Sequence, residues 1–170
     1  LPIVTVKGVQ YSTINGVGFG LDGWCCAQGN IEKQKTRKPV NYAKIALRGL
    51  RGDFKPTNAH IVVDGKEYDF KKVWMAVSMN GRCFGGGMKI APNQDRLNTD
   101  RKLSLVVVHN AGRLRLLTIF PKIFKGTHIK NKSVTVIKGH NIDAFFEDYS
   151  DIEIDGEVIL NVKEYSVKSN

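Results

Sequence analysis

Apolar and polar residues alternate with period two along most of the chain, and Gly, Asn or Asp interrupts the alternation at short intervals. Residues 59–63 (AHIVV) run into Asp64-Gly65, a pair typical of a two-residue hairpin turn, and a strand from Tyr68 to about Met79 is expected to return beside them. The continuously apolar run at 103–109 predicts a central strand. Further short strands are predicted at 134–137, 144–146, 152–154 and 158–167. The pattern predicts a mainly β, α+β fold, with an antiparallel β-sandwich or barrel-like sheet.

Two segments have helical periodicity instead. Residues 41–51 place Tyr42, Ile45, Ala46 and Leu50 on one face, and Lys44, Arg48 and Arg51 on the other. This pattern predicts an amphipathic basic helix, preceded by a basic loop at residues 33–38. A second helix is predicted at 111–120, where Pro121 limits its continuation, although a short further turn could extend to Phe124. One or two amphipathic helices are therefore expected beside the sheet.

Composition fits a single domain over residues 1–170, since 42% apolar residues can fill one core. The sequence has no signal peptide and no run of ~18 uncharged apolar residues, so we expect a cytoplasmic protein. Its three cysteines form no C-x-x-C pair, which argues against a zinc site or a disulfide framework. Cys25 and Cys26 follow Trp24 in an apolar setting that should raise the pKa of a thiol.

The net charge of +10 favours an anionic partner. The basic residues at 33–38 and 41–51 could form a solvated surface, or they could bind an acidic membrane, where each basic side chain contributes on the order of 1 kcal/mol. Nucleic acid is not the expected partner, because aromatic residues are not interleaved with the basic ones. We therefore predict that Lys44, Arg48 and Arg51 face an acidic lipid surface.

Two glycine-rich segments could shape a ligand site. Residues 15–23 (NGVGFGLDG) lack the full G-x-G-x-x-G spacing of a dinucleotide site, and their glycines are expected to let a strand turn tightly. Asp22 would then be exposed at the lip of a cleft with Asn15 nearby, or would hydrogen-bond its own backbone in a turn. Residues 80–92 (NGRCFGGGMKIAP) contain three consecutive glycines, for which we predict a structural bulge and not a phosphate loop, because no helix follows.

The segment Asp155-Gly156-Glu157 carries two carboxylates separated by one glycine. Such a pair could project toward one metal-nucleotide site, where phosphoryl transfer needs charge neutralisation and a proton acceptor. The alternative is an ordinary Asp-Gly hairpin, like the one predicted at Asp64-Gly65. The dipeptide alone does not distinguish the two.

The order and spacing of these three segments resemble the C-terminal half of the diacylglycerol kinase and sphingosine kinase family of lipid kinases. The resemblance covers most of residues 11–165. It implies a lipid-binding domain of a two-domain kinase, whose Gly-Gly-Asp-Gly-Thr nucleotide loop lies in an upstream domain absent from this chain. The chain starts at Leu1 in a strand-like run, which we interpret as a piece of a longer enzyme. ATP and Mg²⁺ are the implied cofactors, with ATP held mainly upstream, so the fragment alone is expected to be inactive.

The resemblance also implies roles for individual residues. Asp22 corresponds to an acidic residue that contacts the lipid head in the sphingosine-kinase branch, and Asn15 lies beside it. Asp155 and Glu157 correspond to the motif that closes the active site, so both are catalytic candidates. Asp100 resembles the aspartate that binds a structural Mg²⁺ in some bacterial members. Here Arg101 replaces the following glycine, and the loop at 93–99 is longer, which weakens that assignment.

The predicted function is the lipid-binding domain of an ATP-dependent kinase that phosphorylates a hydroxyl of diacylglycerol or a sphingoid-type lipid. The alternative is a non-catalytic basic module that binds acidic lipid or nucleic acid. Expected partners are a lipid substrate, an acidic membrane surface and the upstream kinase domain, with a homodimer left open. The expected location is peripheral at a membrane facing the cytoplasm.

Overall fold

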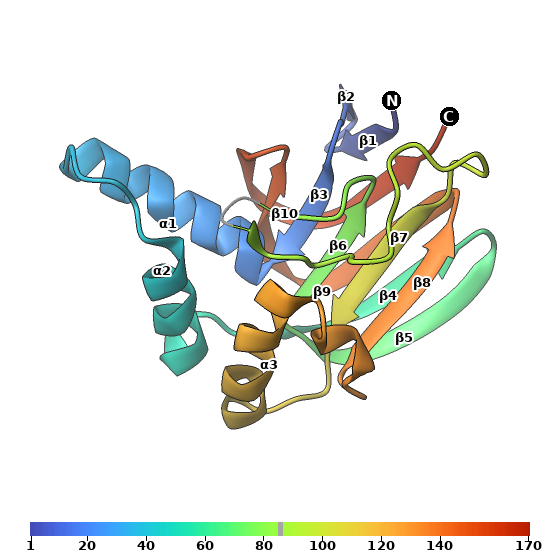
Figure 1. The fold of residues 1–170 in the computed structure, drawn as a ribbon. Helices are drawn as coiled ribbons and strands as arrows, with labels where there is room; N and C mark the ends of the chain where they lie inside the picture. The colour runs from blue at the N-terminus through green and yellow to red at the C-terminus, as the bar shows by residue number, and fades with distance from the viewer. Residues whose placement is uncertain (85–86) are drawn as a thin grey trace.

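The computed structural model describes residues 1–84 and 87–170, in which a ten-stranded sheet carries three helices (Figure 1). The strands are β1 (Ile3–Val6), β2 (Val9–Ser12), β3 (Gly16–Gly20), β4 (Thr57–Val63), β5 (Lys66–Val73), β6 (Met75–Met79), β7 (Leu103–Val108), β8 (Val134–Gly139), β9 (Asn141–Ile154) and β10 (Glu157–Lys168). The helices are α1 (Leu21–Lys35), α2 (Tyr42–Arg48) and α3 (Arg113–Lys125), with short helical turns η1 (Gly49–Asp53) and η3 (His128–Lys130).

The long strand β9 joins two parts of the sheet. Residues 142–146 of β9 pair with β4, whereas residues 152–154 pair with β3, and β10 follows β9 along both parts. All described pairings are antiparallel, in the order β2-β1-β10-β9-β3-β6-β7-β8, with β4 and β5 branching from β9. The predicted mainly β, α+β sandwich-like fold is therefore confirmed. One apolar core, which includes Val17, Phe19, Ile61 and Ile142, fills the space between the strands.

A second core lies between the sheet and the helices. All residues of β6 and β7 are buried, which confirms the prediction that the run at 103–109 is central. Leu50 and Ile119 reach the outer face of these strands from η1 and α3, beside Trp74. The guanidinium of Arg113 lies 5.0 Å from the Trp74 ring centre and donates hydrogen bonds to the carbonyls of Gly49, Leu50 and Phe54. These bonds fix the start of α3 against η1.

The strands differ most from the predicted ones at two places, where a strand is divided or two strands are joined. The predicted strand from Tyr68 to Met79 is divided into β5 and β6, with Lys72 in the left-handed backbone region (φ 50°) just before the break. The strands predicted separately at 144–146 and 152–154 are one strand, β9. β10 bends with it through irregular pairing between Ile159 and Glu164. Local alternation did not reveal these features, because they follow from pairing with strands distant in sequence.

Helix α1 was not predicted, and the basic loop expected at 33–38 is in part its last turn. The 15-residue segment contains two glycines and no clear apolar stripe, both of which disfavour a helix locally. Gly23 shows what stabilises it: a Cβ atom there would lie 2.2 Å from the carbonyl oxygen of Asp151. The glycine allows the helix backbone to pack directly on β9, so tertiary contact outweighs propensity.

The two predicted helices are present with different bounds. Helix α2 ends at Arg48 and continues as the wide turn η1, and the side chain of Asn41 caps its start by accepting a hydrogen bond from the Lys44 amide. Helix α3 continues through Pro121 and ends where Gly126 adopts the left-handed conformation (φ 72°). Among the described residues, no helix has the length and apolarity needed to cross a bilayer.

Candidate functional site

A large apolar cavity lies between the helices and the sheet. It has a volume of about 920 Å³, and α1, α2, α3 and the segment around Met88 all contribute to its wall. Its apolar lining includes Leu21, Ala46, Leu50, Met75, Ile119 and Phe120. Residues from the loop before β3, from α1, from β9 and from the β9–β10 turn gather at one end, namely Asn15, Asp22, Glu153, Asp155 and Gly156. The cavity therefore has an apolar body and an acidic end.

Asp22, in the first turn of α1, contributes a buried acid to this end. Gly18 on β3 leaves the space that its carboxylate occupies. Both carboxylate oxygens are buried, and neither forms a hydrogen bond of full geometry with the described residues; the amides of Asp22 itself and of Gly23 lie near enough to act against the rise of its pKa. Burial, and then the charge of Glu153, raise the pKa of Asp22 well above its ordinary value. The expectation of an exposed carboxylate at the lip was wrong: it points inward, with unused hydrogen-bonding capacity.

Glu153 on β9 is a second acid at this end, which sequence reasoning missed. The residue is only 6% exposed, and its carboxylate accepts a hydrogen bond of 2.7 Å from the Gly156 amide. Burial is the main cause that raises the pKa of Glu153 to about 7. An acid between the buried Ile152 and Ile154 could have been recognised as unusual.

Asp155 holds the loop that leads into β3. Its Oδ1 accepts hydrogen bonds from the Thr13 hydroxyl (2.7 Å) and the amides of Asn15 (2.9 Å) and Gly16 (3.1 Å), and its Oδ2 accepts one from the Ile14 amide (2.8 Å). Burial alone would raise the pKa of Asp155, but these hydrogen bonds lower it below its ordinary value. The carboxylate thus stays ionised and organises the polar end of the cavity.

Glu157 lies at the start of β10 with an exposed side chain. It does not line the large cavity; with Asp155 it borders a smaller depression of about 340 Å³ next to Tyr11 and Ser12. Asp155 borders both hollows and so lies between them. The structure therefore places Glu157 close to Asp155 but outside the lining of the large cavity.

Asn15 connects this loop to the glycine-rich segment at 80–92. Its side-chain amide donates to the carbonyl of Cys83 (2.9 Å), and its own carbonyl accepts from the amides of Asn80 (2.7 Å) and Gly81 (2.9 Å). The structure therefore brings Asn15, Asp22 and Asp155 together on one cavity. Gly85 and Gly86, the centre of the predicted bulge, lie outside the described residues.

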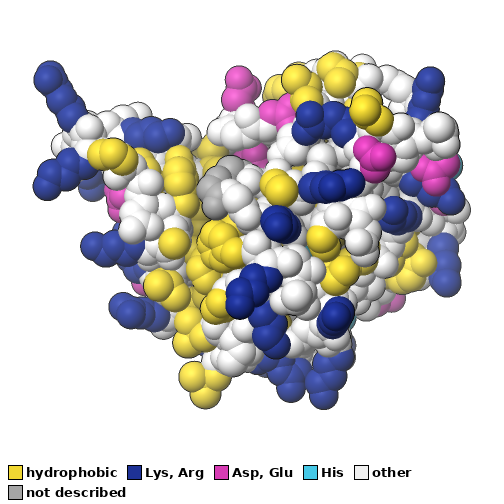
Figure 2. Space-filling model, in the orientation of Figure 1, with side chains coloured by type: hydrophobic (Ala, Val, Ile, Leu, Met, Phe, Trp, Pro, Cys, Tyr) yellow, Lys and Arg dark blue, Asp and Glu magenta, His cyan; other side chains and the backbone are white. Residues whose placement is uncertain are grey.

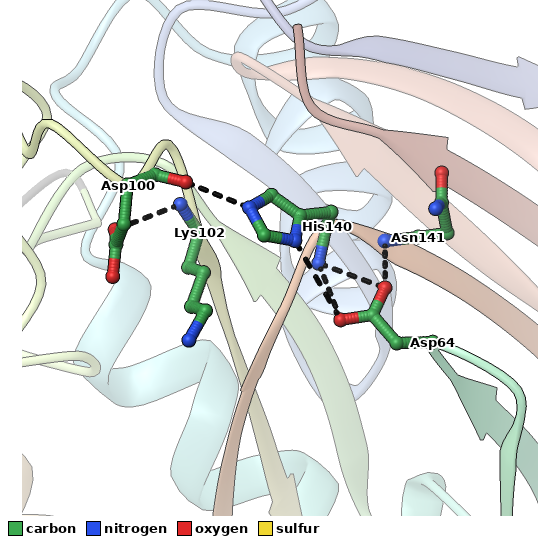
Figure 3. A network of polar contacts seen from close by, with 5 residues as sticks. All are labelled: Asp64, Asp100, Lys102, His140 and Asn141. Atoms are coloured by element: carbon green, nitrogen blue, oxygen red, sulfur yellow. Dashed lines mark hydrogen bonds and ion pairs between the residues drawn. The ribbon is translucent and has the colours of Figure 1, made fainter.

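The structure places Asp100 away from this cavity, beside the hairpins β4–β5 and β8–β9 (Figure 3). Its Oδ1 accepts from the Lys102 amide (3.1 Å), and its carbonyl accepts from Nε2 of His140 (2.7 Å). Across the same network, the carboxylate of Asp64 accepts from the amides of His140 and Asn141. Among residues 1–84 and 87–170, no group of three His, Cys, Asp or Glu side chains could hold a metal ion. These contacts give Asp100 the role of stabilising the turn that leads into β7.

The predicted basic face of α2 is only partly free. Arg48 pairs with Asp53 (3.2 Å) and Glu32 (3.7 Å), donates to Gln28 and lies 5.7 Å from the Trp24 ring centre. Its charge is used to hold α2 and η1 on α1. Lys44 and Arg51 are exposed, and neither forms an ion pair within the described part of the chain.

Two free thiols, Cys25 and Cys26, line the cavity next to Asp22. Burial, and then the charge of Asp22, raise the pKa of Cys25 far above its usual range and the pKa of Cys26 to about 12. Both remain protonated at neutral pH, as the apolar setting predicted. They contribute to the wall of the cavity and are poor nucleophiles.

The chain is similar in sequence to proteins that are named as lipid kinases. A Mycobacterium tuberculosis protein named diacylglycerol kinase is 31% identical over 98 residues, covering 58% of this chain and 31% of that protein. The Bacillus subtilis protein YtlR, provisionally named a lipid kinase, is 29% identical over 158 residues, covering 86% of this chain and 48% of that protein. The chain thus spans less than half the length of these relatives.

The fold is similar to that of solved structures. A crystal structure of a diacylglycerol kinase from Bacillus anthracis superposes with a TM-score of 0.65 at 18% identity, covering 99% of this chain and 53% of that one. At this identity the likeness shows the fold alone. In sequence, residues 15–165 match the family described as the YegS C-terminal NAD kinase beta sandwich-like domain. Since the match covers most of the chain and its named relatives are lipid kinases, the protein belongs to this family as a domain of the diacylglycerol kinase-like group.

Proposed function

We propose that this domain binds the lipid substrate of an ATP-dependent lipid kinase and completes its active site. The observation that carries the proposal is the combination of a 920 Å³ apolar cavity with an acidic end. Its volume and lining suit acyl chains, which are held by apolar contact, and its acidic end suits a polar head with hydrogen-bond donors. Relatives named as lipid kinases support the same reading.

The head of the lipid would meet Asp22 and Glu153. Ester groups only accept hydrogen bonds, whereas a hydroxyl donates one, and Asp22 has two buried oxygens without a partner among the described residues. A donor from the lipid would relieve the cost of leaving these oxygens unpaired. Binding would therefore orient the hydroxyl at the acidic end, which is the positioning that phosphoryl transfer requires.

Asp155 and Glu157 would then have different tasks. The carboxylate of Asp155 already accepts four hydrogen bonds, so it fits poorly as a Mg²⁺ ligand and acts as a positioning residue. The carboxylate of Glu157 is exposed beside the acidic end, so it fits a role toward the metal-nucleotide or the hydroxyl proton. Bound Mg²⁺-ATP would supply the phosphoryl group and neutralise its charge, with the nucleotide held mainly by an upstream domain.

The direct test is an assay of the full-length enzyme with radiolabelled ATP. The lipid panel contains diacylglycerol, a sphingoid base and a single-chain lipid alcohol, and products are extracted into organic solvent and counted. Label in a phosphorylated lipid is the expected result, and the preferred lipid identifies the substrate class. Binding of acidic vesicles without label in any lipid would instead favour a non-catalytic lipid-binding module.

The proposed setting is the surface of an acidic membrane facing the cytoplasm, where the lipid substrate is available. The net charge of +10 supports attraction to anionic lipid. Exposed Lys44 of α2 and Arg51 of η1 are the residues of the predicted basic face that can contribute, because the charge of Arg48 is already paired.

A further inference from the structure

Helix α3 carries an apolar stripe that faces solvent. Leu114 is 82% exposed, Leu117 39% and Phe124 38%, and Pro121 between them is exposed as well. Their spacing of three, four and three residues places them on one side of the helix. The opposite side is buried through Leu116, Ile119 and Ile123. The stripe is therefore separate from the face that holds α3 in the fold.

The stripe continues into the cavity. Phe124 belongs to both the stripe and the lining of the cavity. Its ring packs edge-on against the ring of Phe120, another cavity residue, with 5.7 Å between the ring centres. Tyr42 of α2, 38% exposed, lines the cavity on the other side. Figure 2 shows apolar side chains gathered in the hollow between α3 and the arm formed by α1 and α2, with Lys and Arg side chains around it. An apolar path thus leads from the surface of α3 toward the acidic end.

The charges of α3 identify the partner. The helix has four basic residues and no acidic one. Arg113 is used internally, whereas Arg115, Lys122 and Lys125 are exposed. A helix with exposed apolar residues and only positive charges beside them suits the headgroup and acyl boundary of an anionic bilayer. A second protein surface would have to supply both apolar and acidic groups to the same stripe.

We propose that α3 is the membrane-inserting element of this domain, with Leu114, Leu117 and Phe124 immersed and Lys122 and Lys125 at the level of anionic headgroups. The lipid would then pass from the bilayer along Phe124 and Phe120 into the cavity, with its apolar chains never exposed to water. This proposal rests on the proposed lipid-kinase function. It makes α3, and not α2, the main contact with the membrane.

The test measures binding of the full-length protein to vesicles by co-sedimentation, without any turnover. Vesicles contain phosphatidylcholine with phosphatidylglycerol, or phosphatidylcholine alone. We expect the double variant Leu114→Gln/Leu117→Gln to lower partition into anionic vesicles by roughly tenfold or more, the scale expected when two immersed leucines become polar. Lys122→Gln/Lys125→Gln should reduce the preference for anionic over neutral vesicles. The matched control is Leu97→Gln/Leu160→Gln, which changes leucines that are 86% and 55% exposed and lie outside the lining of the cavity.

A fluorescence measurement checks depth directly. The tryptophan introduced by Leu114→Trp should emit at shorter wavelength when vesicles are added, and brominated acyl chains should quench this emission. The tryptophan introduced by Leu97→Trp should show neither change. The proposal is overturned if the double leucine variant of α3 binds vesicles like wild type, or loses no more than the control. It is also overturned if that variant changes only the oligomeric state in sedimentation equilibrium, which would identify the stripe as a contact between copies.

An activity assay distinguishes the proposed membrane contact through α3 from the proposed lipid-kinase function. With substrate in mixed detergent micelles, the α3 double variant should keep the kcat of wild type, and with substrate in vesicles it should lose activity in proportion to partition. Wild-type protein that binds vesicles through α3 but phosphorylates no lipid would contradict the kinase assignment and leave the membrane contact intact. Equal activity of variant and wild type on vesicles would contradict the membrane contact alone.

Discussion

The Oδ2 atom of Asp22 lies 1.5 Å from the position that a Cβ atom on Gly18 would occupy. The glycine on β3 thus makes room for the buried carboxylate on α1. Gly18→Ala should force Asp22 out of this position and lower the free energy of unfolding by roughly 1 to 3 kcal/mol, as overpacking of a filled site does. Urea unfolding measures the change.

The matched control for Gly18→Ala is Gly112→Ala, because a Cβ atom at Gly112 has no neighbour within 4 Å and its φ is −76°. Its effect should stay within about 0.5 kcal/mol. Equal effects of the two substitutions would show that the space at Gly18 is not needed for the Asp22 carboxylate.

Glu153 should make stability depend on pH. Its pKa is raised from 4.5 to about 7 by burial, so the folded protein keeps a proton that the unfolded chain releases. This contribution is fully present below pH 4.5 and is lost as pH rises through about 7. In wild type the free energy of unfolding should therefore fall by about 2 to 3 kcal/mol as pH rises, and in Glu153→Gln this fall should be absent. The variant should then be more stable than wild type at alkaline pH. Urea unfolding across this pH range would contradict the assignment if variant and wild type had the same slope.

Asp155 should have the opposite pH dependence. Its pKa is lowered by the hydrogen bonds from residues 13–16, so its contribution is present above the ordinary aspartate pKa of 3.8 and is lost as pH falls below it. Asp155→Asn keeps the shape but loses the charge, and should cost about 1 to 2 kcal/mol at neutral pH after screening by solvent. Asp69→Asn, in an exposed pair with His60, is the control and should cost less. No difference between the two would show that Asp155 does not hold the loop.

Glu157 should matter for turnover and little for stability. In the full-length enzyme, Glu157→Gln keeps the turn but removes the charge, and we expect kcat to fall roughly 10²-fold or more, the scale of lost acid–base or electrostatic catalysis. The melting temperature should barely change, because the side chain is exposed. Glu164→Gln on the same strand β10 is the matched control, with an exposed glutamate outside both hollows. Wild-type kcat in Glu157→Gln would remove Glu157 from the catalytic residues.

The Asp64-Gly65 pair, like Asp155-Gly156, does more than form a turn, because its aspartate also holds a neighbouring loop. Asp64 and Asp155 adopt the same left-handed backbone (φ 48° and 49°), each followed by a glycine of positive φ, as a hairpin of this length requires. Each carboxylate also accepts amide hydrogen bonds from a neighbouring loop. The sequence predicted the hairpin at Asp64 and the turn geometry at Asp155, but the loops that they hold are over 70 residues away in the chain.

The sequence by itself determined the elements whose signals are local. Alternation and Asp-Gly pairs predicted most strands, the continuous apolar run predicted the central position of β7, and helical periodicity predicted α2 and α3. The order of the three glycine-containing segments predicted the family, and it selected Asn15, Asp22 and Asp155, which the fold brings to one cavity. These features depend on residue type and spacing, which a single chain displays directly.

Only the tertiary structure decided the features that depend on distant neighbours. Helix α1 forms despite Gly23 because that glycine packs against the backbone of Asp151. Glu153 becomes a partner of Asp22 only when β9 lies next to β3, and the burial of both acids then raises their pKa values. The stripe on α3 is exposed because the sheet takes the opposite face of the helix. Burial and close packing are properties of the assembled fold, so periodicity within one segment cannot reveal them.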